Sequence, residues 1–211
     1  MRGIAIDFEW AVFPDYRVEK GVRGPASAGL LCGAATLPKL VAIGEPFVTR
    51  PLDNFPELYL ELAKARRTID GQIKFAKRYG LLQDRNEEIT MYWSNSVKNM
   101  RNLVAMVEKH ENWKIEEGKY SPLELRESFS FRFELNAETN SINSRVVPKS
   151  LYVALAYQCL SHAADGAQIR VCKSCSALFE AGGASGRRVH AEFCSDKCRY
   201  QFHHRNRSKK Q

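Results

Sequence analysis

The sequence feature that most restricts the fold is a set of four cysteines near the C-terminus. Cys172 and Cys175 are separated by two residues, eighteen residues follow, and Cys194 and Cys198 are separated by three. Two thiolates spaced in this way can bind one tetrahedral metal ion from a tight turn, called a zinc knuckle. Disulfides are not expected, because the sequence shows no secretory signal pattern. We therefore predict one structural Zn²⁺ ion held by four thiolates, which leave no open position for a substrate.

The residues around the two cysteine pairs predict a treble-clef zinc finger. Residues 177–181 are expected to form a strand that returns beneath the knuckle, and the glycines after it turn the chain. A helix that begins at Ser195 or Asp196 would place the second pair on one face. The core of such a unit is small and rarely suffices without metal; it would consist mainly of Phe179, Phe193 and Phe202. His190 is the alternative ligand to one of the cysteines.

Positive charge is concentrated in this C-terminal segment. Residues 168–211 contain ten Lys and Arg against three Asp and Glu, whereas residues 1–167 contain 22 against 21. Four thiolates and Zn²⁺ add −2, so the segment keeps a net charge near +5. A basic helix with interleaved aromatic and histidine residues favours contact with a phosphate backbone, DNA more than RNA, although a merely solvated tail has the same composition. The candidate contacts are Arg187, Arg188, Arg199, Tyr200, His203, Arg205 and Arg207.

The patterns in residues 1–167 predict a body that contains both helices and strands, so we assign the chain to the α+β class. Residues 168–211 are expected to form a separate zinc finger. Hydrophobic residues make up 44% of the chain, enough to bury a core. The longest small and apolar run, 28–35, is too short to span a bilayer, and we expect a cytoplasmic protein without membrane contact. The patterns predict strands over 4–10, within 41–50 and over 129–135, helices over 58–79, 87–110 and 150–164, and a loop over 136–144.

The C-terminal residues resemble the CGNR-type zinc finger over about 165–210. In that bacterial family the finger follows an ABATE-type domain, and members are described as stress-induced transcriptional regulators without established catalytic activity. The sequence departs from the family at the last ligand, where Cys198-Arg199-Tyr200-Gln201 replaces Cys-Gly-Asn-Arg. The resemblance implies a transcriptional regulator whose body senses a small ligand or recruits a protein. It is carried by Cys172-x2-Cys175, Phe179, Arg187-Arg188, Phe193-Cys194-Ser195, Cys198-Arg199 and the basic tail to Arg207.

Two other functional classes fit parts of the sequence. A treble clef can be a rigid platform for a protein partner, with the basic helix facing an acidic surface. A metal-dependent nuclease is suggested by His190, His203 and His204, but such an enzyme needs a second set of metal ligands that the sequence does not provide. Cys159 lies in an apolar helix, where an inert buried thiol is expected. We therefore expect a protein that is not an enzyme.

Overall fold

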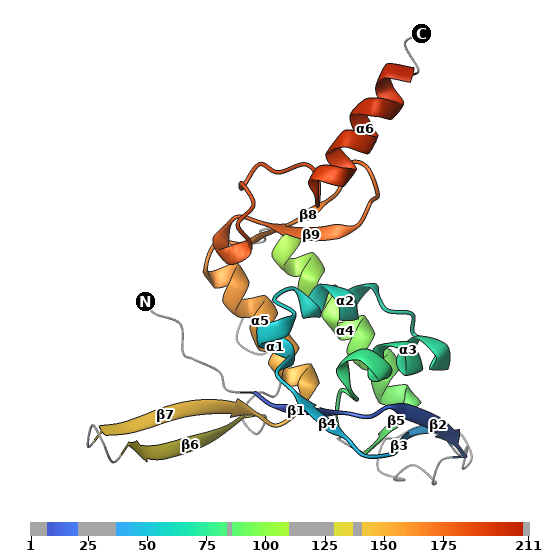
Figure 1. Cartoon of the computed structure of the whole chain (residues 1–211), viewed down its shortest axis with the longest axis vertical. Helices are drawn as coiled ribbons and strands as arrows, with labels where there is room; N and C mark the ends of the chain where they lie inside the picture. The colour runs from blue at the N-terminus through green and yellow to red at the C-terminus, as the bar shows by residue number, and fades with distance from the viewer. Residues whose placement is uncertain (1–7, 21–36, 84–85, 110–128, 137–140, 209–211) are drawn as a thin grey trace.

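The computed structural model describes residues 8–20, 37–83, 86–109, 129–136 and 141–208. It has the predicted α+β class: a body of helices and short antiparallel strands carries a cysteine-containing hairpin, from which the last helix projects (Figure 1). Within these residues no helix is both long and apolar enough to cross a membrane.

Two small antiparallel sheets lie at the end of the body farthest from the last helix (Figure 1). The strand predicted over 4–10 falls mostly outside the described residues; within the described part, residues 8 and 9 are not in a strand, and the strand begins at Trp10 and ends at Val12. The single strand predicted within 41–50 is two strands, because Gly44, with a φ of 89°, turns the chain between them. One sheet pairs β1 (Trp10–Val12) with β4 (Phe47–Thr49), and the other has the order β2 (Asp15–Glu19), β3 (Lys39–Ile43), β5 (Glu87–Ile89).

The helix predicted over 58–79 is wrong as a single element. Its first part ends at Ala65, whose ψ of 147° is extended. The hydroxyl of Thr68 then accepts a hydrogen bond from the backbone N–H of Gly71 at 3.3 Å, which starts a new helix. Gly80 ends that helix as expected. The elements are α1 (Pro51–Asn54), α2 (Leu58–Lys64) and α3 (Ile69–Tyr79).

The next helix, α4 (Thr90–Glu108), begins three residues later than predicted, because residues 87–89 pair with β3 as β5. Its predicted end at His110 lies outside the described residues. The helix packs chiefly against α2 and also reaches the cysteine hairpin. Its apolar stripe is buried as predicted and consists of Trp93, Val97, Met100, Val104 and Val107.

A two-stranded hairpin extends from the body (Figure 1). Its first strand, β6 (Phe129–Asn136), confirms the prediction. The loop predicted over 136–144 is wrong from residue 141, where β7 (Ser141–Pro148) begins. The two strands are antiparallel and their register runs from Phe129 opposite Pro148 to Asn136 opposite Ser141. Backbone pairing forms β7 although its first residues lack apolar alternation.

The last helix of the body, α5 (Leu151–Ala164), matches the prediction over 150–164. The Ser150 hydroxyl accepts a hydrogen bond from the backbone N–H of Val153 at 3.3 Å and so caps the helix. The helix is buried on nearly all sides in the main core. Ile169 of the following strand joins the same core, so the hairpin that carries the cysteines packs directly on the body.

The finger elements follow in the predicted order of hairpin, turn and helix (Figure 1). Glycines at three positions between the hairpin and the helix adopt positive φ angles, as a tight reversal of the chain requires. The elements are β8 (Gln168–Val171), β9 (Leu178–Ala181), the 3₁₀ turn η2 (Gly183–Ser185) and α6 (Asp196–Ser208).

Replacing Gly80 with alanine should lower the free energy of unfolding by more than the same change at Gly166. Both have positive φ, 90° and 83°, so each alanine incurs about 1–3 kcal/mol of backbone strain. A Cβ at position 80 would also lie 2.6 Å from the Ala11 carbonyl oxygen and 2.6 Å from Cδ1 of Trp10, whereas nothing lies within 4 Å at position 166. Urea unfolding followed by circular dichroism measures both losses. Equal losses would contradict the packing of α3 against β1.

Candidate metal centre and its surroundings

The first cysteine pair lies in the turn between β8 and β9. The backbone N–H of Cys172 donates to the carbonyl of Ala177 at 2.9 Å. The N–H of Ser176 donates to the carbonyl of Cys172 at 2.9 Å, and Ser176 adopts a φ of 57° to close the turn. These bonds build the predicted knuckle from Cys172 to Cys175.

The second pair lies at the start of α6, also as predicted. The hydroxyl of Ser195 accepts a hydrogen bond from the N–H of Cys198 at 3.3 Å, so Ser195 caps the helix. The N–H of Lys173 donates to the carbonyl of Glu192 at 3.0 Å, and their side chains form an ion pair. This bridge holds the knuckle beside the segment that carries the second pair.

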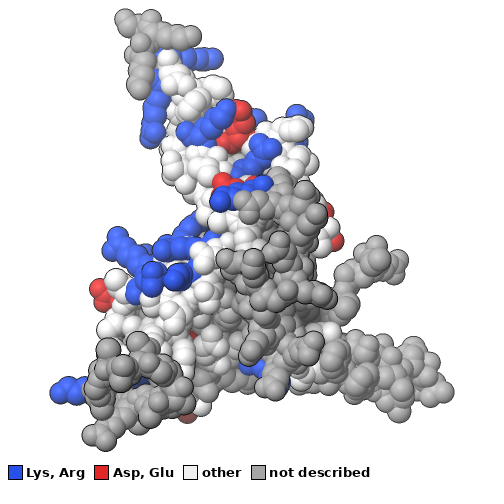
Figure 2. All heavy atoms as spheres, turned by 180° about the vertical axis from the view of Figure 1, so that it is seen from behind, with Lys and Arg blue, Asp and Glu red and all other residues white. Residues whose placement is uncertain are grey.

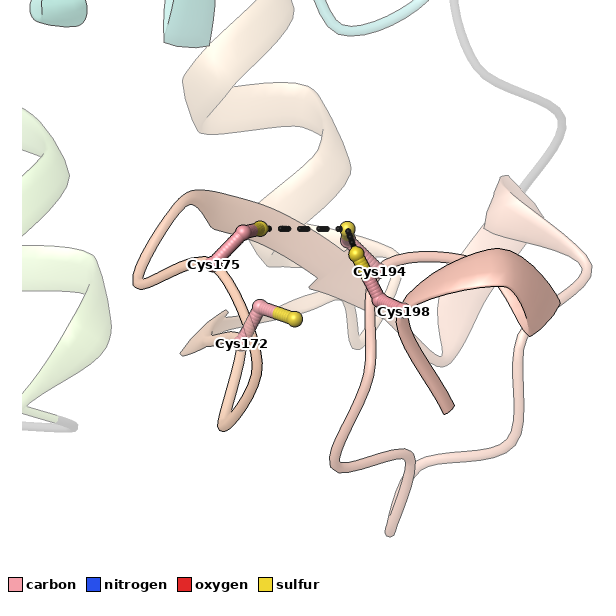
Figure 3. Close-up of side chains that lie close together, drawn as sticks. All are labelled: Cys172, Cys175, Cys194 and Cys198. Atoms are coloured by element: carbon pink, nitrogen blue, oxygen red, sulfur yellow. Dashed lines mark hydrogen bonds between the residues drawn. The ribbon is translucent and has the colours of Figure 1, made fainter. Parts of the chain in front are cut away.

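The four cysteine side chains converge on one point (Figure 3). Their sulfur atoms all lie within 4.8 Å of one another. The Sγ atoms of Cys175 and Cys194 are 3.7 Å apart, and those of Cys194 and Cys198 are 3.5 Å apart. The cluster could hold a metal ion, and His190 does not belong to it.

The surroundings of Cys172 favour its thiolate. Burial raises the pKa of this thiol, but the backbone N–H groups of Cys194, Cys175 and Ser174 outweigh it and lower the pKa to about 6. Burial and the neighbouring thiols raise the pKa of Cys194 to about 12. A cation among the sulfurs would offset this repulsion and favour the thiolate form at all four positions.

The helix α6 carries most of the predicted nucleic-acid contacts and projects away from the body (Figure 1). Its base is fixed by Phe202, whose ring centroid lies 5.3 Å from that of Phe193. Tyr200, His203 and Arg207 recur at spacings of three and four and therefore share one side. Tyr200 is 68% exposed, and Arg205 is also exposed. His204 lies on the same side as Tyr200, which adds it to the candidate contacts.

Three predicted contacts, Arg187, Arg188 and Arg199, line one groove of about 740 Å³ between the finger loop and the start of α6. His190 lines the same groove. Arg199 forms an ion pair with Asp196 at 3.1 Å, and its guanidinium lies 5.6 Å from the centroid of the Tyr200 ring. Basic side chains therefore lie at both ends of α6, with Arg188 and Arg199 near its start and Arg205 and Arg207 near its end.

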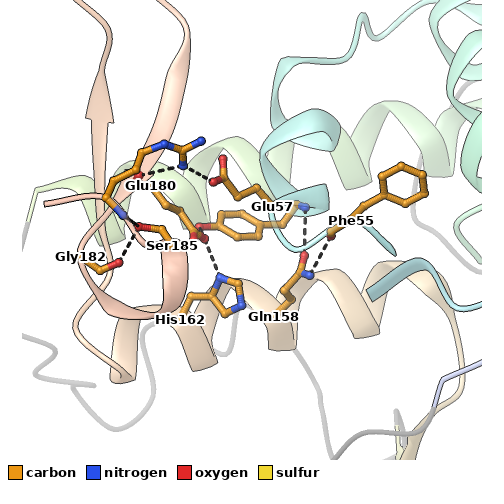
Figure 4. Close-up of polar contacts among 9 residues, drawn as sticks. Phe55, Glu57, Gln158, His162, Glu180, Gly182 and Ser185 are labelled. Atoms are coloured by element: carbon orange, nitrogen blue, oxygen red, sulfur yellow. Dashed lines mark hydrogen bonds and ion pairs between the residues drawn. The ribbon is translucent and has the colours of Figure 1, made fainter. Parts of the chain in front are cut away.

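Arg187 is also engaged within the molecule, by contacts with Glu57 and Glu180, which Figure 4 labels. Its guanidinium forms an ion pair with Glu57, which precedes α2, and donates to the backbone carbonyl of Glu180 at 3.2 Å. It also lies 5.8 Å from the centroid of the Phe179 ring. We therefore assign Arg187 to the junction between finger and body.

A buried polar group at this junction was not found from the sequence (Figure 4). The Tyr59 hydroxyl donates a hydrogen bond to the Glu180 carboxylate, which is 2% exposed, and Nδ1 of His162 lies 2.6 Å from the same oxygen. Burial and Glu180 both raise the pKa of Tyr59, so this hydroxyl stays a donor. The one signal in the sequence is Glu180 itself, a carboxylate within the apolar strand Leu178–Ala181.

Cys159 is the inert thiol that the sequence predicts. It is 1% exposed, and burial followed by the Glu180 charge raises its pKa to about 12. Of the histidines suggested for a nuclease, His203 packs against the rings of Phe193 and Phe202, and His190 and His203 belong to no group of potential metal ligands among the described residues.

No family model, curated protein or solved structure matches this chain. The resemblance to the CGNR-type zinc finger therefore stays a prediction carried by the quoted residues. Function has to be inferred from the cysteine cluster, α6 and the charges around them.

The stability of the protein should fall as pH rises through the folded-state pKa of His162. Its hydrogen bond with Glu180 raises this pKa above the usual 6.5. Protonated His162 therefore stabilises the fold fully below about pH 6.5, and the contribution is lost as pH rises through the raised value. Urea unfolding at about pH 6 and about pH 9 should show a larger decrease for the wild type than for His162→Gln. An equal decrease in the free energy of unfolding for the wild type and for His162→Gln would contradict the pairing of His162 with Glu180, because the two proteins have all their other titrating groups in common.

Proposed function

We propose that this chain is a zinc-finger protein that binds nucleic acid, duplex DNA in preference to RNA, and acts as a bacterial transcriptional regulator in the cytoplasm. The observation that carries the proposal is α6, a basic and exposed helix that projects from the cysteine cluster (Figure 1). The regulatory role is supported by the resemblance of residues 165–210 to the CGNR-type finger.

Zinc is the ion that best suits the cluster. Tetrahedral Zn²⁺ with bonds of about 2.3 Å to sulfur separates its ligands by about 3.8 Å. The two sulfur separations of 3.7 Å and 3.5 Å are close to that value. Thiolates are soft ligands that select zinc over magnesium or calcium, and four of them leave no open position. The ion would therefore be structural, and it would fix where α6 begins.

The shape and charge of α6 suit a nucleic-acid groove. A helix of 13 residues is about 20 Å long, and the major groove of B-DNA, about 12 Å wide, admits an α-helix. Asp196 is its one acidic residue, whereas four basic side chains are distributed along it: Lys197, Arg199, Arg205 and Arg207. These cations can release counterions from phosphates, which supplies sequence-independent affinity.

Replacing Cys175 with serine should release the metal and unfold α6. Metal binding supplies folding free energy to a unit whose own core is this small. Atomic absorption should find one zinc per wild-type chain and none in Cys175→Ser, with limited proteolysis removing the C-terminal segment of the variant. Cys159→Ala is the matched control and should keep its zinc, because Cys159 lies outside the cluster. A Cys175→Ser protein that retains one zinc would refute the assigned ligands.

Replacing Arg205 and Arg207 with glutamine should weaken duplex binding and flatten its salt dependence. The slope of log affinity against log salt should fall by about 0.9 for each phosphate that the variant no longer neutralises. Fluorescence anisotropy at several salt concentrations measures it, with Arg17→Gln/Lys20→Gln as a control of equal charge change on exposed residues of the body. An unchanged slope in the α6 variant would argue against this helix as the contact. If the wild type does not bind duplex DNA at low salt, the DNA proposal fails, and single-stranded RNA and acidic proteins become the partners to test.

A further inference from the structure

A second group of basic side chains lies on the body. We call it the α4 patch; it consists of Arg66 and Arg67, in the connection between α2 and α3, with Lys98 and Arg101 of α4, all of them exposed. Figure 2 shows Lys and Arg side chains gathered on the body below the finger, on the same face as basic side chains of the projecting helix. The helix that carries half of the patch packs against β8 of the finger, which links the two regions.

Hydrogen bonds hold the connection between α2 and α3 against α4. Arg101 donates from Nε to the carbonyl of Ala63 at 2.7 Å, and from a terminal nitrogen to the carbonyl of Ala65 at 2.7 Å. These carbonyls end α2, where a cation is favoured by the helix dipole. Arg101 therefore fixes the geometry of the patch as well as contributing to its charge.

Two more bonds hold the backbone of Arg66 and the side chain of Arg67 against α4. Nε1 of Trp93 donates to the carbonyl of Arg66 at 3.0 Å, and Nε of Arg67 donates to the hydroxyl of Ser94 at 2.9 Å. Lys98 follows Ser94 by one helical turn and therefore lies on the same side of α4. The connection and the adjoining turns of α4 thus present four cations to solvent.

The patch residues form no ion pairs with described residues, although two acidic side chains, Glu61 and Asp70, line the same groove as Arg66. Residues 62–69 and 90–107 contain no Asp or Glu. Within the described part of the chain, none of the four side chains forms an ion pair. The exposed neighbours on α4 include the amides of Asn95 and Asn102. Arg, Lys and Asn are side chains that commonly donate to phosphate oxygens.

We infer that the α4 patch is a second contact surface for the phosphate backbone of the nucleic acid that α6 binds, an inference that rests on the proposed function. The composition of the patch favours a polyanion over a protein, because the patch consists of four cations without an ion pair among the described residues, whereas the centre of a protein interface is depleted of charged residues. The exposed side chains on this side of α4 are basic or polar apart from Met91, which is 41% exposed. A duplex held by α6 would thus also be held by the body.

The experiment compares the full, zinc-loaded chain with a triple variant, Arg66→Gln/Arg67→Gln/Lys98→Gln. Arg101 is left in place because it holds the carbonyls of α2. The control is Arg17→Gln/Lys20→Gln/Lys77→Gln, an equal charge change on exposed residues around β2, where Lys77 pairs with Asp15 at 2.9 Å. Circular dichroism and urea unfolding check that both variants keep the fold, and anisotropy with duplex DNA is measured across a salt series.

The patch variant should bind at least about tenfold more weakly at 0.1 M salt, with a log–log slope reduced by about 2 to 3, while the control stays near the wild type. Combining the patch changes with those at Arg205 and Arg207 should add the two slope changes. If the wild type binds and the α6 variant is impaired but the patch variant is not, this inference is overturned and the proposed function stands. An equal loss in the control would also overturn it, since total charge alone would then explain the effect. Failure of the wild type to bind would overturn both.

Discussion

Glu180 makes the most buried polar contact between the finger and the body. Its buried carboxylate is bonded to the Tyr59 hydroxyl of α2 and to His162 of α5, while its own strand, β9, belongs to the finger. Burying a carboxylate without hydrogen-bond partners lowers the stability of the fold by several kcal/mol. The position of β9 is therefore stable only if Tyr59 and His162 both reach the Glu180 carboxylate. The cysteine knuckle follows β8 and precedes β9, so this contact contributes to where the cysteine cluster lies relative to the body.

At this junction the hairpin β8–β9 contacts the body, whereas the helix α6 projects away from it (Figure 1). Arg187 joins Glu57 to the finger loop, and the amide of Gln158 bridges the N–H of Tyr59 and the carbonyl of Phe55. The Arg187 ion pair and the buried Ile169 tie the hairpin to the body, whereas the Gln158 bonds lie within the body, between α5 and the segment at the start of α2. The basic helix α6 begins at the cysteine cluster and extends beyond it (Figure 1). A rigid hairpin that supports an exposed helix is an arrangement in which side chains can reach into a groove without rearrangement of the fold.

The sequence predicts those features that depend on residues close together in the chain. The spacing of the four cysteines predicted the knuckle and the start of α6, because each is formed by residues that are close together in the chain. The break between α2 and α3 was missed because Leu62, Ala65 and Ile69 keep helical spacing across it. The bonds that stabilise the break come from Trp93 and Arg101, far along the chain. The role of Glu180 was missed for the same reason, since its donor Tyr59 is 121 residues away.

The distribution of charge on the folded body also could not be predicted from the sequence, because the net charge of a segment does not say where its charged side chains lie. Residues 1–167 contain 22 basic and 21 acidic residues and look neutral as a sequence. In the folded body, Lys39 and Lys64 form ion pairs with Glu87 and Glu61, whereas the α4 patch forms no ion pair among the described residues, although Glu61 and Asp70 line the same groove as Arg66. A phosphate within a Debye length of the patch, about 8 Å at physiological salt, senses those nearby cations more than the distant carboxylates. The body is therefore suited to a polyanion on one face even though its net charge is close to zero.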